Sequence, residues 1–216
     1  MSFRSKVRNL CYVFVAVLVA SCATPATRSE LTPAYTAQVP SKVTIGVIDN
    51  RPYVVSGEKE PWFEGLTRDG FGIPHTFNRP KRPATETFAD RIASMLERTF
   101  VDAGSQVKIV KLPKGLPRKA AIERLEPGSA GATLLVQIFD SKFDAGGFSF
   151  NYEYDFRLNV LGPEGNILAE ATNEGQGGVT PSDKHSIWDM FGVVYREKFD
   201  RLLANPDIQQ AIARTS

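Results

Sequence analysis

The sequence predicts an α+β fold, in which a mixed β-sheet is packed on one face by two long amphipathic helices. Residues 148–161 (FSFNYEYDFRLNVL) place apolar side chains at seven alternate positions, the period of a strand with one buried and one wet face. Residues 85–104 and 182–203 instead carry apolar residues at the spacing of one helix face. The predicted order of elements, β-α-β-α-β-β-β-α, gathers the helices beside a single sheet.

The first predicted strand covers residues 42–50 (KVTIGVIDN), which are β-branched and almost wholly apolar in the middle. That composition is typical of a strand covered on both faces. Residues 51–84 follow, rich in proline and glycine and without a period of 2 or 3.6. We therefore expect one long loop there, and a loop of this length in a compact domain is usually functional or disordered.

The middle of the chain alternates helices and strands. Thr85 is the expected N-cap of the first long helix, and Gly104 is the expected C-terminal cap. A second strand is predicted over residues 106–112 (QVKIVKL), a short helix over 118–125 (RKAAIERL), and a buried strand over 132–139 (ATLLVQIF).

The aromatic strand 148–161 is expected to pair with residues 166–174 (NILAEATNE) in a hairpin. Its aromatic stripe predicts packing against the helices, and a ligand platform is the alternative. Residues 175–178 (GQGG) indicate a turn, Ser182 is the expected cap of the last long helix, and residues 207–214 are expected to form an exposed final turn or two.

The first 21 residues have the composition of a secretory signal peptide. Three cations, at positions 4, 6 and 8, precede an apolar run over residues 10–20 (LCYVFVAVLVA). Eleven helical residues span about 16 Å, well short of the ~30 Å hydrocarbon core of a bilayer. A basic start, a short apolar centre and small residues at the end are typical of a signal. An N-terminal membrane anchor helix is the alternative.

The end of this segment, Val19-Ala20-Ser21-Cys22, resembles the lipobox of bacterial lipoproteins. The resemblance implies that Cys22 is acylated and becomes the first residue of the mature chain. Two or three acyl chains hold a protein firmly on a bilayer, whereas one binds only marginally. Ala23 follows the cysteine, which in the enterobacterial sorting rule implies the periplasmic face of the outer membrane; the inner membrane is the alternative.

Residues 22–41 combine the lipidated cysteine with a segment rich in Ala, Thr, Ser and Pro, which predicts a flexible tether with a reach of about 24 Å. Residues 42–216 are then expected to form a single domain. Without the three cations that precede Cys22, 23 basic residues face 24 acidic ones. This balance gives no field to attract nucleic acid, so no nucleic-acid partner is expected.

The mature chain lacks the residues of common catalytic and metal sites. Cys11 is lost with the signal and Cys22 is blocked, so a cysteine nucleophile and cysteine metal ligands are excluded. His75 and His185 share no metal-binding spacing. We therefore predict no enzyme, no cofactor and no metal.

Candidate binding residues lie in the long loop. Phe71 and Ile73 are expected to pin this loop onto the core, and no phosphate-loop motif is present. A basic cluster further along is a candidate contact for lipid headgroups, with a solvated loop as the alternative. Ion pairs are expected between Asp49 and Arg51 and between Arg68 and Asp69. The possible binding loop consists of Arg68, Asp69, Gly70, Phe71, Gly72, Arg79, Lys81 and Arg82, and a packed structural loop is the alternative.

Residues 43–51 (VTIGVIDNR), followed by the helix that ends at Gly104, resemble YajG-type outer-membrane lipoproteins. The similarity covers about residues 15–175, and the long 51–84 segment departs from the shorter loop of that family. The family has no established activity, so the resemblance implies none. We predict a non-enzymatic binding or assembly module of the cell envelope, held to the membrane through Cys22 and contacting an unknown envelope protein. The alternatives are an auxiliary subunit of an envelope transport or secretion system, and a hydrolase with an unrecognised site.

Overall fold

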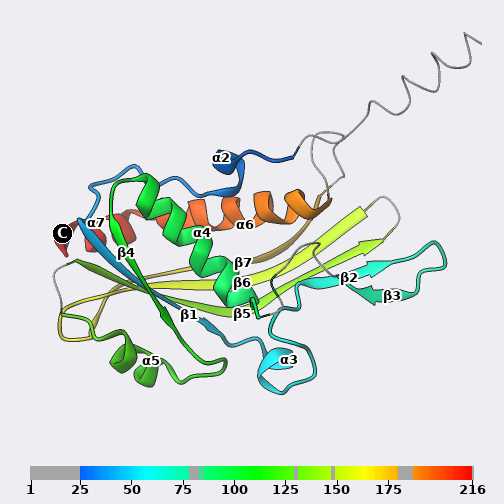
Figure 1. Ribbon diagram of the computed structural model, residues 1–216, viewed down its shortest axis with the longest axis horizontal. Coiled ribbons are helices and arrows are strands. Elements are labelled where there is room, and N and C mark those ends of the chain that lie inside the picture. Colours follow the sequence, from blue (N-terminus) through cyan, green and yellow to red (C-terminus); the bar gives the residue numbers. More distant parts are fainter. Residues whose placement is uncertain are drawn as a thin grey trace, which may run out of the picture.

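A curled mixed sheet occupies the centre of the structure, with helices against both faces (Figure 1). The predicted α+β class is therefore confirmed. The computed structural model describes residues 25–77, 83, 85–128, 131–146, 149–179 and 187–215, and the helices and strands named below lie within these ranges.

Strand β1 (Lys42–Asp49) lies inside the sheet and is parallel to both of its neighbours, the edge strand β4 (Gln106–Lys111) and β5 (Ala132–Gly146). Its side chains are buried on both faces, as the sequence predicts. Ile45 belongs to the larger core cluster on one face, and Ile48 belongs to the smaller cluster on the other. A strand so enclosed needs apolar residues at consecutive positions, which explains its sequence.

Strand β5 continues past its predicted end because it changes partners. A register shift follows Ile138, and such irregularities bend a strand. Beyond the bend, β5 pairs with β2 (Gly65–Arg68) in place of β1. β2 is parallel to β5 and antiparallel to β3 (Pro74–Thr76). The strand order on this side of the sheet is β3-β2-β5-β1-β4.

From the other edge of β5, the antiparallel strands β6 (Ser149–Leu161) and β7 (Ile167–Val179) complete the sheet. The predicted alternation of β6 is confirmed, because the apolar side chains of one face belong to the core cluster that β6 shares with the long helices. The fully enclosed members of that face are Phe156, Leu158 and Val160, with Phe150 also buried.

The glycine-rich segment 175–178 lies in β7, and the turn predicted there is wrong. An ideal Cβ at Gly177 would lie 2.6 Å from the phenol oxygen of Tyr152, and one at Gly175 would lie 3.1 Å from that of Tyr154. The missing side chains leave room for the two tyrosine rings of the neighbouring strand. The glycines therefore serve close packing inside the sheet.

The two long helices α4 (Phe88–Asp102) and α6 (Ile187–Leu203) cover one face of the sheet (Figure 1). The N-cap of α4 is Thr87, two residues after the predicted one. Its hydroxyl accepts from the backbone N–H of Asp90, whose carboxylate accepts from the N–H of Thr87. Gly104 follows the helix with φ +102°, as the sequence predicts. Ser182, the predicted cap of α6, lies outside the described residues.

The opposite face of the sheet is covered in part by α5 (Arg118–Leu125), which has its predicted bounds. Its Ala121 and Leu125 pack on Ile48, Leu135 and Leu161 in the smaller core cluster. Because α5 has only two fully buried side chains, it contributes less apolar burial than the two long helices.

The last helix, α7 (Pro206–Arg214), is part of the core and not the exposed turn that the sequence predicts. Asn205 caps it by accepting from the N–H groups of Asp207 and Ile208. Ile208 and Ile212 are fully buried. Two apolar residues four apart lie on one helix face, and a segment of nine residues was too short for this pattern to distinguish a buried helix from an exposed one.

Residues 25–41 lie on α4 and α6, which differs from the free tether predicted there. The short helix α2 (Arg28–Leu31) forms within this segment. The N–H of Ala26 donates to Asp189 at 3.2 Å, and the N–H of Ala34 donates to Asp200 at 2.8 Å. Both carboxylates belong to α6 and lie 163 and 166 residues further along the chain than the groups that donate to them. The composition of residues 25–41 alone therefore could not predict that this segment packs on the domain.

Candidate functional site

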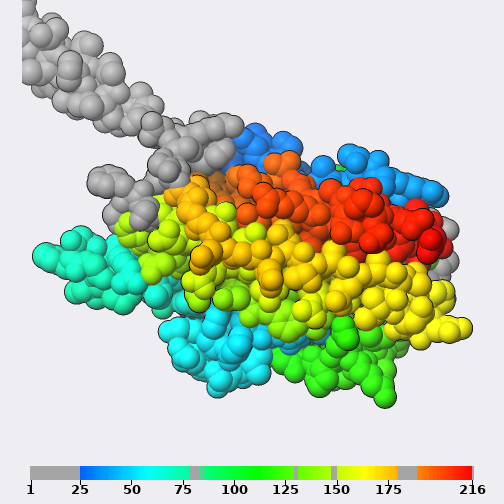
Figure 2. All heavy atoms as spheres, turned by 180° about the vertical axis from the view of Figure 1, so that it is seen from behind, coloured from blue at the N-terminus to red at the C-terminus, as the bar shows by residue number. Residues whose placement is uncertain are grey.

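Two short strands and the turn between them project from one end of the sheet as a hairpin (Figures 1 and 2). We call residues 65–76 the projecting hairpin. It lies inside segment 51–84, which the sequence predicts to be a loop; α3 (Pro52–Val55) also forms there, so that prediction is wrong for the described residues. Candidate residues 68–72 form the tip of the hairpin, whereas Arg79, Lys81 and Arg82 lie outside the described residues.

The turn at the tip is organised by the side chain of Asp69. Its Oδ1 accepts from the backbone N–H groups of Phe71 at 2.9 Å and Ile73 at 3.0 Å. Its Oδ2 lies 3.2 Å from Nε2 of His75 on β3. The hydrogen bond to His75, followed by those from the two backbone N–H groups, lowers the pKa of Asp69. Gly72 adopts φ +79°, a left-handed conformation that favours glycine.

The apolar residues of the tip point into solvent and not onto the core. The side chain of Phe71 is 93% exposed and that of Ile73 is 53% exposed. The expectation that they pin the segment onto the core is therefore wrong. Because Asp69 fixes the turn from within, the tip keeps its shape without apolar support.

Arg68 does not pair with Asp69 as predicted. Its guanidinium pairs with Asp144 on β5, with Nη2 at 2.6 Å and Nε at 2.8 Å from the carboxylate oxygens. This contact lowers the pKa of Asp144. An ion pair so exposed contributes little stability, but its bidentate geometry links the end of β2 to β5, the strand with which β2 pairs.

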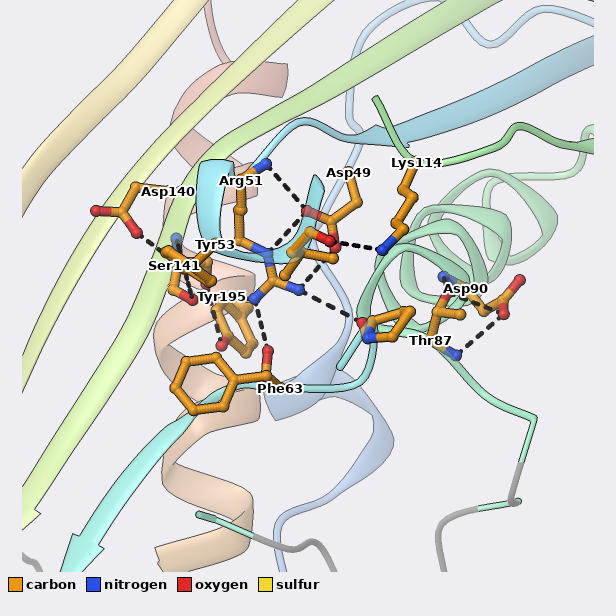
Figure 3. Close-up of polar contacts among 12 residues, drawn as sticks. Asp49, Arg51, Tyr53, Phe63, Thr87, Asp90, Lys114, Asp140, Ser141 and Tyr195 are labelled. Atoms are coloured by element: carbon orange, nitrogen blue, oxygen red, sulfur yellow. Dashed lines mark hydrogen bonds and ion pairs between the residues drawn. The ribbon is translucent and has the colours of Figure 1, made fainter. Parts of the chain in front are cut away.

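The base of the hairpin is held by the buried side chain of Arg51 (Figure 3). Its Nε and Nη2 donate to the two carboxylate oxygens of Asp49 at 2.8 and 2.7 Å, as the predicted ion pair requires. Burial alone would lower the pKa of Arg51, but the hydrogen bonds and charge of Asp49 outweigh it and raise that pKa. The remaining N–H groups donate to the carbonyls of Pro61, Phe63 and Ser141.

A second buried ion pair involves Glu64, the residue directly before the hairpin. Arg91 of α4 pairs with Glu64, and the exposed fractions of the two side chains are 14% and 4%. The guanidinium of Arg91 also lies 5.2 Å from the ring centre of Tyr195 on α6. The residue before the hairpin is thus attached to a helix that covers the core.

The hairpin begins at Gly65, where only glycine fits. Its φ is +152°, and an added Cβ would lie 2.2 Å from the backbone oxygen of Phe143. The N–H of Phe143 donates to the carbonyl of Glu64, and the N–H of Phe77 donates to the carbonyl of Gly65. These contacts fix both ends of the hairpin to the body of the domain.

The polar groups at this base are hydrogen-bonded to one another and to the main chain. Burial raises the pKa of the phenols of Tyr53 and Tyr195, so both stay protonated. The single O–H of Tyr53 lies within reach of two acceptors, Oδ1 of Asp140 at 2.9 Å and the carbonyl of Ser141 at 3.0 Å, and the phenol oxygen of Tyr195 lies 3.3 Å from Oγ of Ser141. Within the part of the chain that the structure describes, no three His, Cys, Asp or Glu side chains are placed to hold a metal ion.

Sequence reasoning missed most of this cluster. Glu64, Arg91 and Tyr195 come from three distant segments, and no local pattern relates them. The spacing of Asp49 and Arg51 was the one available signal.

Among the described residues, every helix is too short or too polar to span a bilayer.

No protein-family model matches this sequence, and no curated protein matches it. Two solved structures are similar in general chain course. Protein XCC0632 of Xanthomonas campestris, described as DUF330, has a TM-score of 0.47 and 12% identity, over 85% of this chain and 98% of that one. Lipoprotein GNA1162 of Neisseria meningitidis has a TM-score of 0.36 and 9% identity, over 76% of this chain and 98% of that one.

Proposed function

We propose that this protein is a lipid-anchored, non-enzymatic binding or assembly module of the bacterial cell envelope, held at the periplasmic face of the outer membrane through Cys22. The sequence Val19-Ala20-Ser21-Cys22, directly after a short apolar run, carries the proposal. Acyl chains on this cysteine hold the domain firmly on a bilayer.

The packing of residues 25–41 supports an anchor close to the domain. Ala26 is held on α6 by its hydrogen bond to Asp189. Only three peptide units separate Cys22 from Pro25, and they span at most about 11 Å. This distance is less than half of the reach expected for a free tether, so the proposed anchor keeps one particular end of the domain beside the bilayer.

The intact mass of the native protein tests the anchor. We expect the mass of residues 22–216 plus two or three acyl chains, and fractionation with the membrane. Cys22→Ala should abolish the added mass and prevent cleavage after residue 21, because the sulfur that carries the lipid is missing. Cys11→Ala is the matched control, since Cys11 lies in the proposed signal and its replacement should change neither result. A native chain that begins elsewhere, or carries no acyl mass, contradicts the proposal.

A second measurement tests the choice of membrane. Ala23→Asp places the acidic residue of the inner-membrane rule directly after the lipidated cysteine. We expect the native protein in the outer-membrane fraction after density-gradient separation and the variant in the inner-membrane fraction. An unchanged distribution, with acylation intact, would contradict the assigned location without affecting the anchor.

A further inference from the structure

We propose that the tip of the projecting hairpin, formed by Phe71 and Ile73, lies in the interfacial layer of the same bilayer that holds Cys22. This inference rests on the proposed lipid anchor. It assigns a partner of defined chemistry, a phospholipid surface, to the candidate binding residues 68–72 and to Ile73 beside them.

The start of the described chain and the hairpin are attached to the same end of α6. Ala26 is hydrogen-bonded to Asp189 in the first turn of that helix. Phe191, two residues later, packs edge-on against Phe77 with ring centres 4.4 Å apart. The N–H of Phe77 donates to the carbonyl of Gly65 at 2.9 Å, which closes the base of the hairpin. The lipid anchor and the hairpin therefore belong to one end of the molecule.

The hairpin extends away from this end, whereas the rest of the domain extends the other way. Figure 1 shows β2 and β3 projecting beyond the first turn of α6, and Figure 2 shows the same projection from behind. The four residues of β2 alone advance the chain by about 13 Å. The turn at residues 162–165 lies at the opposite end of β6, whose thirteen residues span about 43 Å. A bilayer that holds Cys22 is thus near the hairpin and far from that turn.

The tip has the composition that the interfacial layer of a membrane favours. Phe71 and Ile73 have the two largest exposed fractions among the large apolar side chains of the described residues. Removing such apolar surface from water is favourable. An aromatic ring at the level of the headgroups is a common membrane contact.

Backbone N–H groups of the tip are already hydrogen-bonded within the hairpin, which lowers the cost of moving the tip out of water. Unpaired N–H groups are costly where water is scarce, and here Asp69 already accepts from the N–H groups of Phe71 and Ile73. The polar side chains beside the tip have partners as well: Arg68 is ion-paired with Asp144, and Asp69 is hydrogen-bonded to His75. Because these pairs flank the apolar residues, they would remain at the level of the polar headgroups.

A fluorescent label at the tip tests this contact in the full native protein. The mature chain has no free thiol when Cys22 is acylated, so Phe71→Cys can be labelled alone with the environment-sensitive dye NBD. The acylated protein is placed in vesicles of phosphatidylethanolamine and phosphatidylglycerol. We expect a blue shift of NBD emission relative to the same label on an unacylated Cys22→Ser chain free in solution, and a loss of emission when nitroxide lipids are added to the vesicles.

The matched control carries the same dye at Glu164→Cys, in the exposed turn at the far end of β6. We expect neither a blue shift nor nitroxide quenching at this position. If the label at residue 71 behaves like the label at residue 164 while the protein floats with the vesicles, the inference is overturned and the anchor is retained. A blue shift without vesicles, together with a doubled molecular mass, would also overturn it, because a second copy would then cover the tip.

The hairpin contact can be separated from the lipid anchor. A chain that begins at residue 22 with Cys22→Ser and an N-terminal hexahistidine tag can be held on vesicles by nickel-chelating lipid. We expect the same blue shift at residue 71 in this tethered chain. A native mass without acyl groups would contradict the proposed function alone, whereas an unshifted label in the tethered chain would contradict the hairpin contact alone.

Discussion

Arg51 is fully buried, yet all five of its side-chain N–H groups have acceptors. Two of these acceptors are the carboxylate oxygens of Asp49, and the other three are backbone carbonyls of Pro61, Phe63 and Ser141. A buried charge is costly unless it is paired and hydrogen-bonded. The guanidinium therefore holds the end of β1, the approach to the hairpin and the bend of β5 in one arrangement.

Replacement of Arg51 should destabilise the domain strongly. Arg51→Met leaves the buried carboxylate of Asp49 without its partner, and breaking such a pair costs about 3–5 kcal/mol. Urea unfolding followed by circular dichroism measures the loss. Asp49→Leu combined with Arg51→Met removes both charges and should recover part of the stability. A loss below about 1 kcal/mol in the single variant would show that the pair does not hold the hairpin base.

The spacing of Asp49 and Arg51 in the sequence was sufficient to predict their ion pair, because Asp49 ends β1 and Arg51 lies only two residues later. The three carbonyl acceptors were not predictable, since they depend on where residues 61–63 and β5 meet. Backbone carbonyls have no sequence signature. The network around a charged side chain is therefore visible only after folding.

At the scale of elements, the projecting hairpin depends on Asp69 because the strands are very short. β2 has four residues and β3 has three, too few to support a turn by cross-strand pairing alone. The carboxylate of Asp69 supplies acceptors to two turn amides and to His75. The shape of the tip is consequently sensitive to the charge of one residue.

Acidification should loosen the tip. The pKa of Asp69 is lowered in the folded protein, so the stabilisation by its carboxylate is fully present above the unfolded value of about 3.9 and is lost as the pH falls through the lower folded value. We expect the amide protection factors of Phe71 and Ile73, measured by hydrogen exchange, to decrease below about pH 4.

Asp69→Asn is the control for this titration, because it keeps one acceptor oxygen and cannot ionise. Protection of the two amides should be lower than in the native chain at pH 6 and should no longer change below it. An Asn variant that loses protection at the same pH as the native chain would assign the titration to another group.

Periodicity predicted the long elements well and the short ones poorly. Strand β6 and helix α4 each show several repeats of their period, and their existence was confirmed. The hairpin strands contain too few residues for any period, and Pro74 begins one of them. The sequence could propose residues 68–72 as a binding segment, but their presentation on a hairpin required the pairing of β2 with β5.

At the scale of the whole molecule, the attachment of residues 25–41 decides which end faces a proposed membrane. Helix α2 packs against α6, where Leu31 occupies the space beside Gly192. An added Cβ at Gly192 would lie 2.5 Å from a methyl carbon of Leu31. A glycine in the middle of a long helix costs stability, and here it allows the N-terminal segment to approach closely.

Gly192→Leu should release the N-terminal segment without unfolding the sheet. A leucine side chain would take the place of Leu31, so we expect faster tryptic cleavage after Arg28. Glu197→Leu, at an exposed position on the same helix, should leave the cleavage rate unchanged. Cleavage after Arg28 that is equally slow in Gly192→Leu and in the native chain would show that contacts other than Leu31 hold the segment.

The sequence by itself determined the α+β class, the long helices, the aromatic strand and the paired charges of Asp49 and Arg51, and it supplied the lipobox-like segment on which the proposed anchor depends. These features follow from local spacing, because a period or a motif is complete within a few residues. Only the tertiary structure decided that residues 25–41 lie on α6 and that the glycines of β7 accommodate tyrosines. It also decided that Phe71 is exposed on a hairpin attached to the same end of α6 as Ala26. Each of those outcomes depends on contacts between distant segments, whose free energy is distributed over partners that no local pattern identifies.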